Sequence, residues 1–155
     1  MVSSQETVVR RKSFAAGGAR HAERVMRVAL LHDLQETRTG DMPRTVADYY
    51  GAETRRAAER AAFDDVMRGA GERHAARYAE LHEDYESRAS AEARLVKAAD
   101  VIDLLAQALA FERAGARGLA EFWEGAEARD FGLEGPAREV VREVVAALVA
   151  ERSRQ

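Results

Sequence analysis

The 155-residue sequence contains no cysteine, which excludes disulfides, thiolate catalysis and cysteine-bound zinc. No segment approaches the ~18 continuous apolar residues of a membrane span, and residues 1–6 lack the apolar run of a secretory signal. The formal net charge is only −3, so we expect neither nucleic acid nor a membrane as a partner. These absences favour a cytoplasmic protein.

Strand signals and helix breakers are also scarce, because the chain has only two prolines and no run of alternating polar and apolar residues. Long segments consist of alanine, glutamate, arginine and leucine, which are strong helix formers. We therefore predict an all-α bundle of about six helices, with a weakly ordered segment at 1–19 and a single domain at 20–155. The expected helices cover about 20–37, 53–68, the stretch from Gly71 to about 85, 91–113, and Gly135-Pro136 to about 152, with short helices at 45–50 and around 119–123.

Aromatic and histidine side chains are assigned mainly by their neighbours. Five aromatic residues have apolar neighbours and are expected in the core: Phe63, Tyr78, Phe111, Phe122 and Trp123. His74 and His82 lie among charged residues and are expected on a solvated face. His21 lies three turns before His32, about 16 Å along a helix, which is too far to share an ion with it.

The residues that indicate chemistry are concentrated between positions 32 and 41: His32, Asp33, Glu36, Gly40 and Asp41. On a continuous helix Asp33 and Glu36 would lie close to His32 on one face, because successive positions turn by about 100°. Imidazole nitrogen combined with carboxylate oxygen suits Mn, Fe, Co, Ni or Zn, and suits Mg less well. The alternative is that His-Asp is a common dipeptide and that Glu36 is a solvated residue near a helix end.

Asp100 is a second candidate, because it lies in an apolar helix between Val96 and Leu104, its neighbours at four residues on either side. A carboxylate at such a position is unfavourable unless it is paired or bound to a metal ion. The alternative is an ordinary helix-surface ion pair with Lys97, three residues earlier.

Together these segments resemble the HD-domain phosphohydrolase family, closest to the branch that contains the 5'-deoxynucleotidases and HD domain-containing protein 2. The resemblance rests on the order and spacing of segments over about residues 20–150: His32-Asp33-Leu34-Gln35-Glu36, Gly40-Asp41-Met42-Pro43, Glu53 to Glu59, Glu83-Asp84-Tyr85-Glu86, Ser90-Ala91-Glu92-Ala93 and Val96-Lys97-Ala98-Ala99-Asp100.

The resemblance implies an all-α HD-type domain with one divalent metal ion, for which His32, Asp33 and Asp100 would be ligands. It implies that Glu36 orients the attacking water and that Asp41 assists departure of the nucleoside 5'-oxygen. The implied substrates are (deoxy)nucleoside 5'-monophosphates, and members of the family commonly form homodimers.

The N-terminal region departs from the family pattern. Residues 5–8 resemble the segment that precedes the family's first metal-binding histidine, but Arg11 stands near that histidine's position. A divergent or truncated start, or a site completed by another chain, would explain the difference. The leading prediction is a metal-dependent 5'-nucleotidase, and the alternative is a catalytically impaired HD fold that acts as a nucleotide-binding or interaction module. A plain helical bundle without a site is the third reading.

Overall fold

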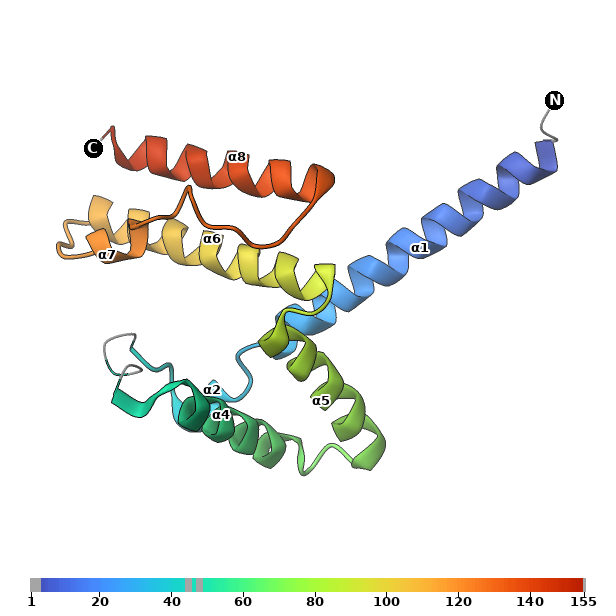
Figure 1. Cartoon of the computed structure of the whole chain (residues 1–155), viewed down its shortest axis with the longest axis horizontal. Helices are drawn as coiled ribbons and strands as arrows, with labels where there is room; N and C mark the ends of the chain where they lie inside the picture. Colours follow the sequence, from blue (N-terminus) through green and yellow to red (C-terminus); the bar gives the residue numbers. More distant parts are fainter. Residues whose placement is uncertain (1–3, 44–45, 47–48, 155) are drawn as a thin grey trace. The chain divides into compact units, whose positions relative to one another are not determined.

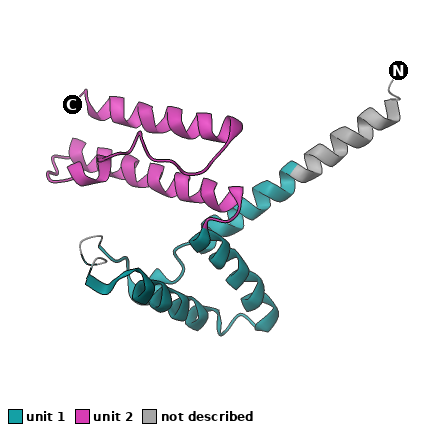
Figure 2. Ribbon diagram, viewed as in Figure 1, with its two compact units in different colours: residues 1–87 teal, residues 88–155 magenta. Residues whose placement is uncertain are grey.

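The computed structural model describes residues 4–43, 46 and 49–154, with side chains from residue 18 onward. In this part of the chain the secondary structure is helical and contains no strand, which confirms the all-α prediction (Figure 1). The chain divides into two compact units, unit 1 (residues 1–87) and unit 2 (residues 88–155) (Figure 2). Each is described by itself, and the single domain expected at 20–155 stays a prediction.

Unit 1 contains four labelled helices: α1 (Ser4–Leu31), α2 (Glu36–Thr39), α4 (Ala52–Met67) and α5 (Glu72–Ser87). Helix α1 packs against α5, and α4 packs against both α2 and α5. The buried apolar side chains come from α1, α4 and α5: Val28, Ala62, Phe63, Leu81 and Tyr85.

Helix α1 differs from its expected bounds of about 20–37 at both ends. It begins at Ser4, because adding residues to a helix that is already nucleated costs less than starting a new one, even where weak helix formers such as Val8, Val9 and Gly18 occur. It ends at Leu31, where a tight turn replaces the helix. The short helix expected at 45–50 lies largely outside the described residues.

Unit 2 contains α6 (Ala91–Arg113), the short α7 (Ala120–Trp123) and α8 (Gly135–Arg152). Helices α6 and α8 run parallel, and the chain returns between them through α7 (Figure 1). Leu105, Leu109 and Val145 are buried with Trp123 in one core cluster. The bounds expected for α4, α6 and α8 agree with the structure to within about two residues.

Local signals explain where the helices of unit 2 begin. Ser90 is the N-cap of α6, because its hydroxyl accepts a hydrogen bond from the Ala93 amide at 3.0 Å. Pro136 occupies the first turn of α8, where its missing N–H is of no consequence.

Two of the expected core aromatics are exposed. Phe63 and Trp123 are buried as expected, whereas Phe111 is 58% exposed and Phe122 is 36% exposed. Apolar neighbours in sequence therefore did not identify the buried face of the helix at these two positions.

Among the described residues, none of the helices has the length and apolar character that crossing a bilayer requires.

Candidate metal centre

The turn after α1 carries the His32-Asp33 pair. The Leu34 amide donates to the Leu31 carbonyl at 3.2 Å, and the Glu36 amide donates to the Asp33 carbonyl at 2.9 Å. These bonds span three residues rather than four, so the backbone is tighter here than in an α-helix. The prediction of one continuous helix through Glu36 is wrong, and His32 and Asp33 project from a turn between α1 and α2.

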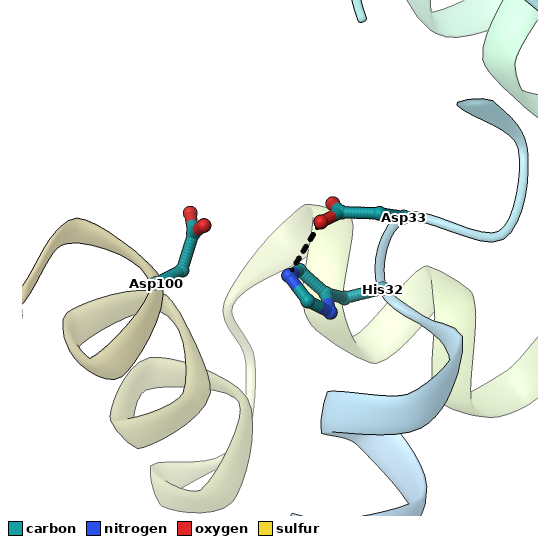
Figure 3. Close-up of side chains that lie close together, drawn as sticks. All are labelled: His32, Asp33 and Asp100. Atoms are coloured by element: carbon teal, nitrogen blue, oxygen red, sulfur yellow. Dashed lines mark ion pairs between the residues drawn. The ribbon is translucent and has the colours of Figure 1, made fainter. Parts of the chain in front are cut away.

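The His32 ring is oriented by contacts on three sides within unit 1. Its Nδ1 lies 2.8 Å from the Ala29 carbonyl oxygen, and its Nε2 lies 2.8 Å from Oδ2 of Asp33 (Figure 3). The ring of Tyr85 on α5 meets it edge-on, with 5.2 Å between the centroids. Tyr85 is itself buried. The imidazole is therefore held by a helix terminus, a neighbouring acid and an aromatic wall.

These contacts determine which nitrogen of His32 is available to a ligand. A carbonyl oxygen only accepts hydrogen bonds, so Nδ1 carries the proton that is donated to Ala29. In neutral His32 the Nε2 lone pair consequently faces the Asp33 carboxylate, an arrangement that is favourable only with a proton or a cation beside both atoms. Metal-binding histidines typically donate their other N–H in this way to a backbone carbonyl.

The separation of the two donor atoms also suits a metal ion. Two ligand atoms that each lie about 2.1 Å from one ion, at right angles, are roughly 3 Å apart. The Nε2 to Oδ2 distance of 2.8 Å is close to that value. The donor set of His32 and Asp33 therefore fits a divalent cation of the kind expected from the sequence.

Gln35 is the last residue of this turn and is only 5% exposed. Its Nε2 donates to the His32 carbonyl at 2.9 Å, and its own backbone carbonyl accepts from the amides of Arg38 and Thr39, the last two residues of α2. Its Oε1 is buried without a hydrogen-bond partner in the described structure. An unsatisfied buried acceptor lowers the stability of the folded state by about 1–3 kcal/mol. Glutamine is therefore a destabilising residue type at this position.

Glu36 is the first residue of the short helix α2, and Asp41 lies just after its end. Glu36 is half-buried at the start of α2, and Gly40 ends that helix with φ +70°, its amide donating to the Glu36 carbonyl at 2.8 Å. Asp41 follows in an exposed, non-helical segment. Gly40 therefore ends α2 and not the helix expected over about 20–37, and its positive φ is a backbone conformation that favours glycine.

Asp100 belongs to unit 2, near the middle of α6. Its Oδ2 accepts a hydrogen bond from the Lys97 ammonium at 2.7 Å, and both side chains are about one-third exposed. The ion pair considered from the sequence is therefore present. His32, Asp33 and Asp100 each offer one atom of a kind that binds metal ions. The side chain of Arg11 lies outside the described residues.

Helix α2 is anchored to α4 by an ion pair that the sequence did not indicate. The Arg38 guanidinium donates to Asp65 at 2.8 Å, and Arg68 approaches the same carboxylate at 2.9 Å. The hydrogen bond from Arg38, with the charge of Arg68, lowers the pKa of Asp65. Arg38 follows Glu36 by two residues, so this anchor fixes the segment that carries Glu36.

His82 is buried, and its assignment to a solvated face is wrong. Its ring stacks at a tilt on Phe63, with 4.2 Å between the centroids, and its Nε2 has no hydrogen-bond partner in the described structure. Burial lowers the pKa of His82, opposed by the negative charge of Glu59. Burial, together with the charge of Glu86, raises the pKa of Glu59.

Three residues that contact the site or its neighbouring segment were not predicted as site residues, namely Gln35, Asp65 and Tyr85, and neither was the buried Asp84. For Asp84 and Tyr85 a signal existed, because Tyr78, Leu81, His82 and Tyr85 have the spacing of one helix face. Asp84 is buried beside this face and accepts a hydrogen bond from Arg24 at 2.6 Å.

Comparison with known proteins gives three findings. A family profile described as an HD domain matches residues 13–127. A 5'-deoxynucleotidase named HDDC2 from Xenopus laevis is 32% identical over 90 residues, which are 58% of this chain and 44% of the relative. A solved structure of a conserved hypothetical protein from Pyrococcus furiosus is similar with a TM-score of 0.66 at 32% identity, covering 83% of this chain and 66% of the other. The chain thus spans less than half the length of the curated relative.

Proposed function

Because this chain belongs to the HD domain family, we propose that it is a metal-dependent phosphohydrolase that removes phosphate from (deoxy)nucleoside 5'-monophosphates. The observation that carries the proposal is the orientation of His32, whose Nδ1 is committed to the Ala29 carbonyl while Nε2 faces Asp33. The similarity to a protein named as a 5'-deoxynucleotidase supports the choice of substrate class.

We propose that His32, Asp33 and Asp100 are the ligands of one divalent ion, with Co, Mn, Ni, Fe or Zn favoured over Mg by the mixed nitrogen and oxygen donors. When bound, such an ion lowers the pKa of a coordinated water and neutralises phosphate charge. The ammonium of Lys97, which contacts Asp100, has to yield to the ion or stay on the other carboxylate oxygen.

Glu36 and Asp41 are the proposed proton-handling residues. Glu36 lies at the start of α2, three residues after Asp33, and in this proposal its carboxylate orients the attacking water. Asp41 lies just beyond Gly40 in an exposed position, where its carboxyl group can deliver a proton to the departing 5'-oxygen. Arg38, held by Asp65, fixes the backbone between these two acids.

A phosphate-release assay over deoxynucleoside and ribonucleoside 5'-monophosphates, with Co, Mn or Mg supplied, tests the proposal. Glu36→Gln is expected to lower turnover roughly 10²–10⁴-fold while metal affinity is retained. Glu53→Gln, in the first turn of α4, is the matched control and is expected to keep its turnover. A metal-loaded wild type without turnover, combined with an Asp33→Ala variant that binds metal as well as the parent, would refute the proposal.

The alternative is an HD-fold protein that binds nucleotides or partners without hydrolysing them. Departure of the N-terminal sequence from the family pattern at Arg11 favours this alternative. Nucleotide binding without phosphate release in the presence of every metal would support it, whereas turnover that disappears in Glu36→Gln would rule it out. Homodimer formation, a cytoplasmic location and the absence of nucleic-acid and membrane partners stay predictions.

A further inference from the structure

We propose that Gln35 is a positioning residue of the metal centre, and that its buried amide fixes the turn from which His32 and Asp33 project. This inference rests on the proposed function, since it concerns the same site. It assigns a role to a side chain that is neither a proposed ligand nor a proposed proton-transfer group.

Gln35 makes hydrogen bonds to the segments on both sides of it, through its side chain and through its backbone. Its Nε2 donates to the His32 carbonyl at 2.9 Å, so the side chain holds the backbone of the ligand residue itself. Its backbone carbonyl accepts from the Arg38 amide at 2.9 Å and from the Thr39 amide at 3.2 Å. One residue therefore connects the turn that carries His32 with the helix that begins at Glu36.

The turn at residues 32–35 is tighter than an α-helix. The Leu34 and Glu36 amides bond across three residues, and the His32 carbonyl is turned toward the buried amide of Gln35. Without the Gln35 donor this carbonyl would lose a buried partner, and a regular helix through residues 32–36 would become a competing conformation. In such a helix His32 and Asp33, as consecutive residues, would project in directions about 100° apart, so the shared helix face expected from the sequence would not bring their side chains together.

A buried glutamine is an unfavourable residue at position 35 if stability alone is considered. Gln35 is almost fully buried, and its Oε1 has no hydrogen-bond partner in the described structure. An apolar side chain would fill the same space without stranding an acceptor. Buried polar groups without a hydrogen-bond partner are unfavourable for stability and are expected mainly at functional sites. Here such a group lies two residues after Asp33 and on the side chain that bonds to the His32 carbonyl.

Two substitutions separate the donor from the acceptor of Gln35. Gln35→Met keeps the length and removes both polar groups, whereas Gln35→Glu keeps an acceptor but removes the N–H₂ donor. The matched control is Gln107→Met, because Gln107 is an exposed glutamine on α6 whose Nε2 also donates, in that case to Asp103.

The experiment is titration of Co²⁺ into chelator-treated full-length protein, with stability followed by thermal unfolding and the His32 tautomer followed by ¹⁵N-detected NMR. We expect both Gln35 variants to bind Co²⁺ about 10-fold to 100-fold more weakly than the wild type, the range typical of residues that orient metal ligands. We expect His32 in the metal-free variants to lose its single Nδ1-protonated signature, and Gln107→Met to behave as the wild type.

Several outcomes would overturn the inference. Folded Gln35→Met that binds Co²⁺ as tightly as Gln107→Met would do so, because both polar groups would then be dispensable. Full affinity of Gln35→Glu at a pH where its carboxyl group is ionised would do so as well, because a carboxylate cannot donate to the His32 carbonyl. Failure of both variants to fold would assign the amide to the core of unit 1 instead of to the ligand turn. A wild type that binds no Co²⁺ would refute the proposed function, and in that case the His32 tautomer in wild type and Gln35→Met still tests whether Gln35 sets the turn.

Discussion

The two units bury different kinds of side chain. The polar or charged residues that are buried in the described structure, Gln35, His82 and Asp84, all belong to unit 1. The interior of unit 2 is formed by Leu105, Val145, Trp123 and other apolar residues. Unit 2 therefore has the composition expected of a structural core, although the Trp123 Nε1 and Arg94 Nε atoms are also buried without a hydrogen-bond partner in the described structure. Among the described residues, only unit 1 buries whole polar or charged residues, which require specific partners.

This difference indicates where the sequence serves purposes other than stability. Where apolar residues recur at helical spacing, the sequence pattern, the helix and the burial of the side chains all favour the same structure. Such agreement characterises a stable core. In unit 1, the Gln35 amide and the His82 ring are buried, and each has a polar atom without a hydrogen-bond partner in the described structure. Gln35 also bonds to the backbone of His32 in the turn that carries the His32-Asp33 pair. The His32-Asp33 pair and the polar interior thus occur in unit 1, whereas the third proposed ligand, Asp100, belongs to unit 2.

The largest effect is expected from the core of unit 2. Leu105 is fully buried, so Leu105→Ala is expected to lower the free energy of unfolding by about 2–5 kcal/mol. Its neighbour Leu104 is 42% exposed, and Leu104→Ala is expected to cost about 0.5 kcal/mol or less. Urea unfolding followed by circular dichroism measures both, and equal losses would contradict the assigned packing of α6.

The next effect tests whether unit 1 depends on a polar contact. Arg24 donates a hydrogen bond to the buried Asp84 carboxylate at 2.6 Å, so Arg24→Ala is expected to lower the free energy of unfolding by about 1–3 kcal/mol. Arg60→Ala removes a similar pair, with Glu83, in which both side chains are mainly exposed, and we expect a loss of about 0.5 kcal/mol or less. The comparison fails if Arg60→Ala is the more destabilising variant in urea unfolding.

The pH dependence of stability sharpens the contrast further. Because the pKa of His82 is lowered in the folded protein, the unfolded chain binds more protons below about pH 6.5. The contribution of neutral His82 is therefore complete above that pH and is lost as the pH falls toward the folded pKa. The charged groups that act on this ring are Glu59, Asp64, Glu83 and Arg60.

His82→Phe preserves a ring against Phe63 and removes the titrating group. Between pH 7.5 and pH 5 we expect the variant to lose less stability than the wild type, measured as the urea midpoint at each pH. His74→Phe, at an exposed position, is expected to keep the wild-type dependence. A steeper loss in His82→Phe would show that the ring does not titrate as argued.

The smallest effect is expected at the exposed anchor of α2. The pKa of Asp65 is lowered by its hydrogen bond with Arg38, so its contribution is present at neutral pH and is lost as the pH falls through the lowered value. Asp65→Asn is expected to reduce the urea midpoint slightly at pH 7 and to converge with the wild type in strong acid. Asp64→Asn is the neighbouring control, and an identical loss in both variants would remove the anchoring role.

The helices were largely predictable from the sequence, whereas the site was predictable only in part. Ser90 and Gly135-Pro136 mark helix starts by simple local chemistry, so α6 and α8 could be placed closely. The turn at 32–35 could not, because it depends on bonds across three residues and on the buried Gln35 amide. His82 was misassigned because its charged neighbours concealed its position on the face shared with Leu81 and Tyr85.

The ligand roles illustrate the same division. Residue types and spacing identified His32, Asp33 and Asp100 as unusual, but only the resemblance to HD-domain proteins gave each a role. The structure added the orientation of the His32 ring, which no sequence pattern contains, because it depends on the Ala29 carbonyl and on Tyr85 across the unit.

The most direct test of the metal centre is calorimetric titration of Co²⁺ into chelator-treated wild type, Asp33→Ala, Asp100→Ala and Asp103→Ala. Asp103 lies three residues after Asp100 on the same helix and bonds to Gln107, so it controls for the loss of one carboxylate from α6. We predict one ion per chain for the wild type and Asp103→Ala, and no measurable binding for Asp33→Ala and Asp100→Ala. Wild-type affinity in Asp100→Ala would contradict the account.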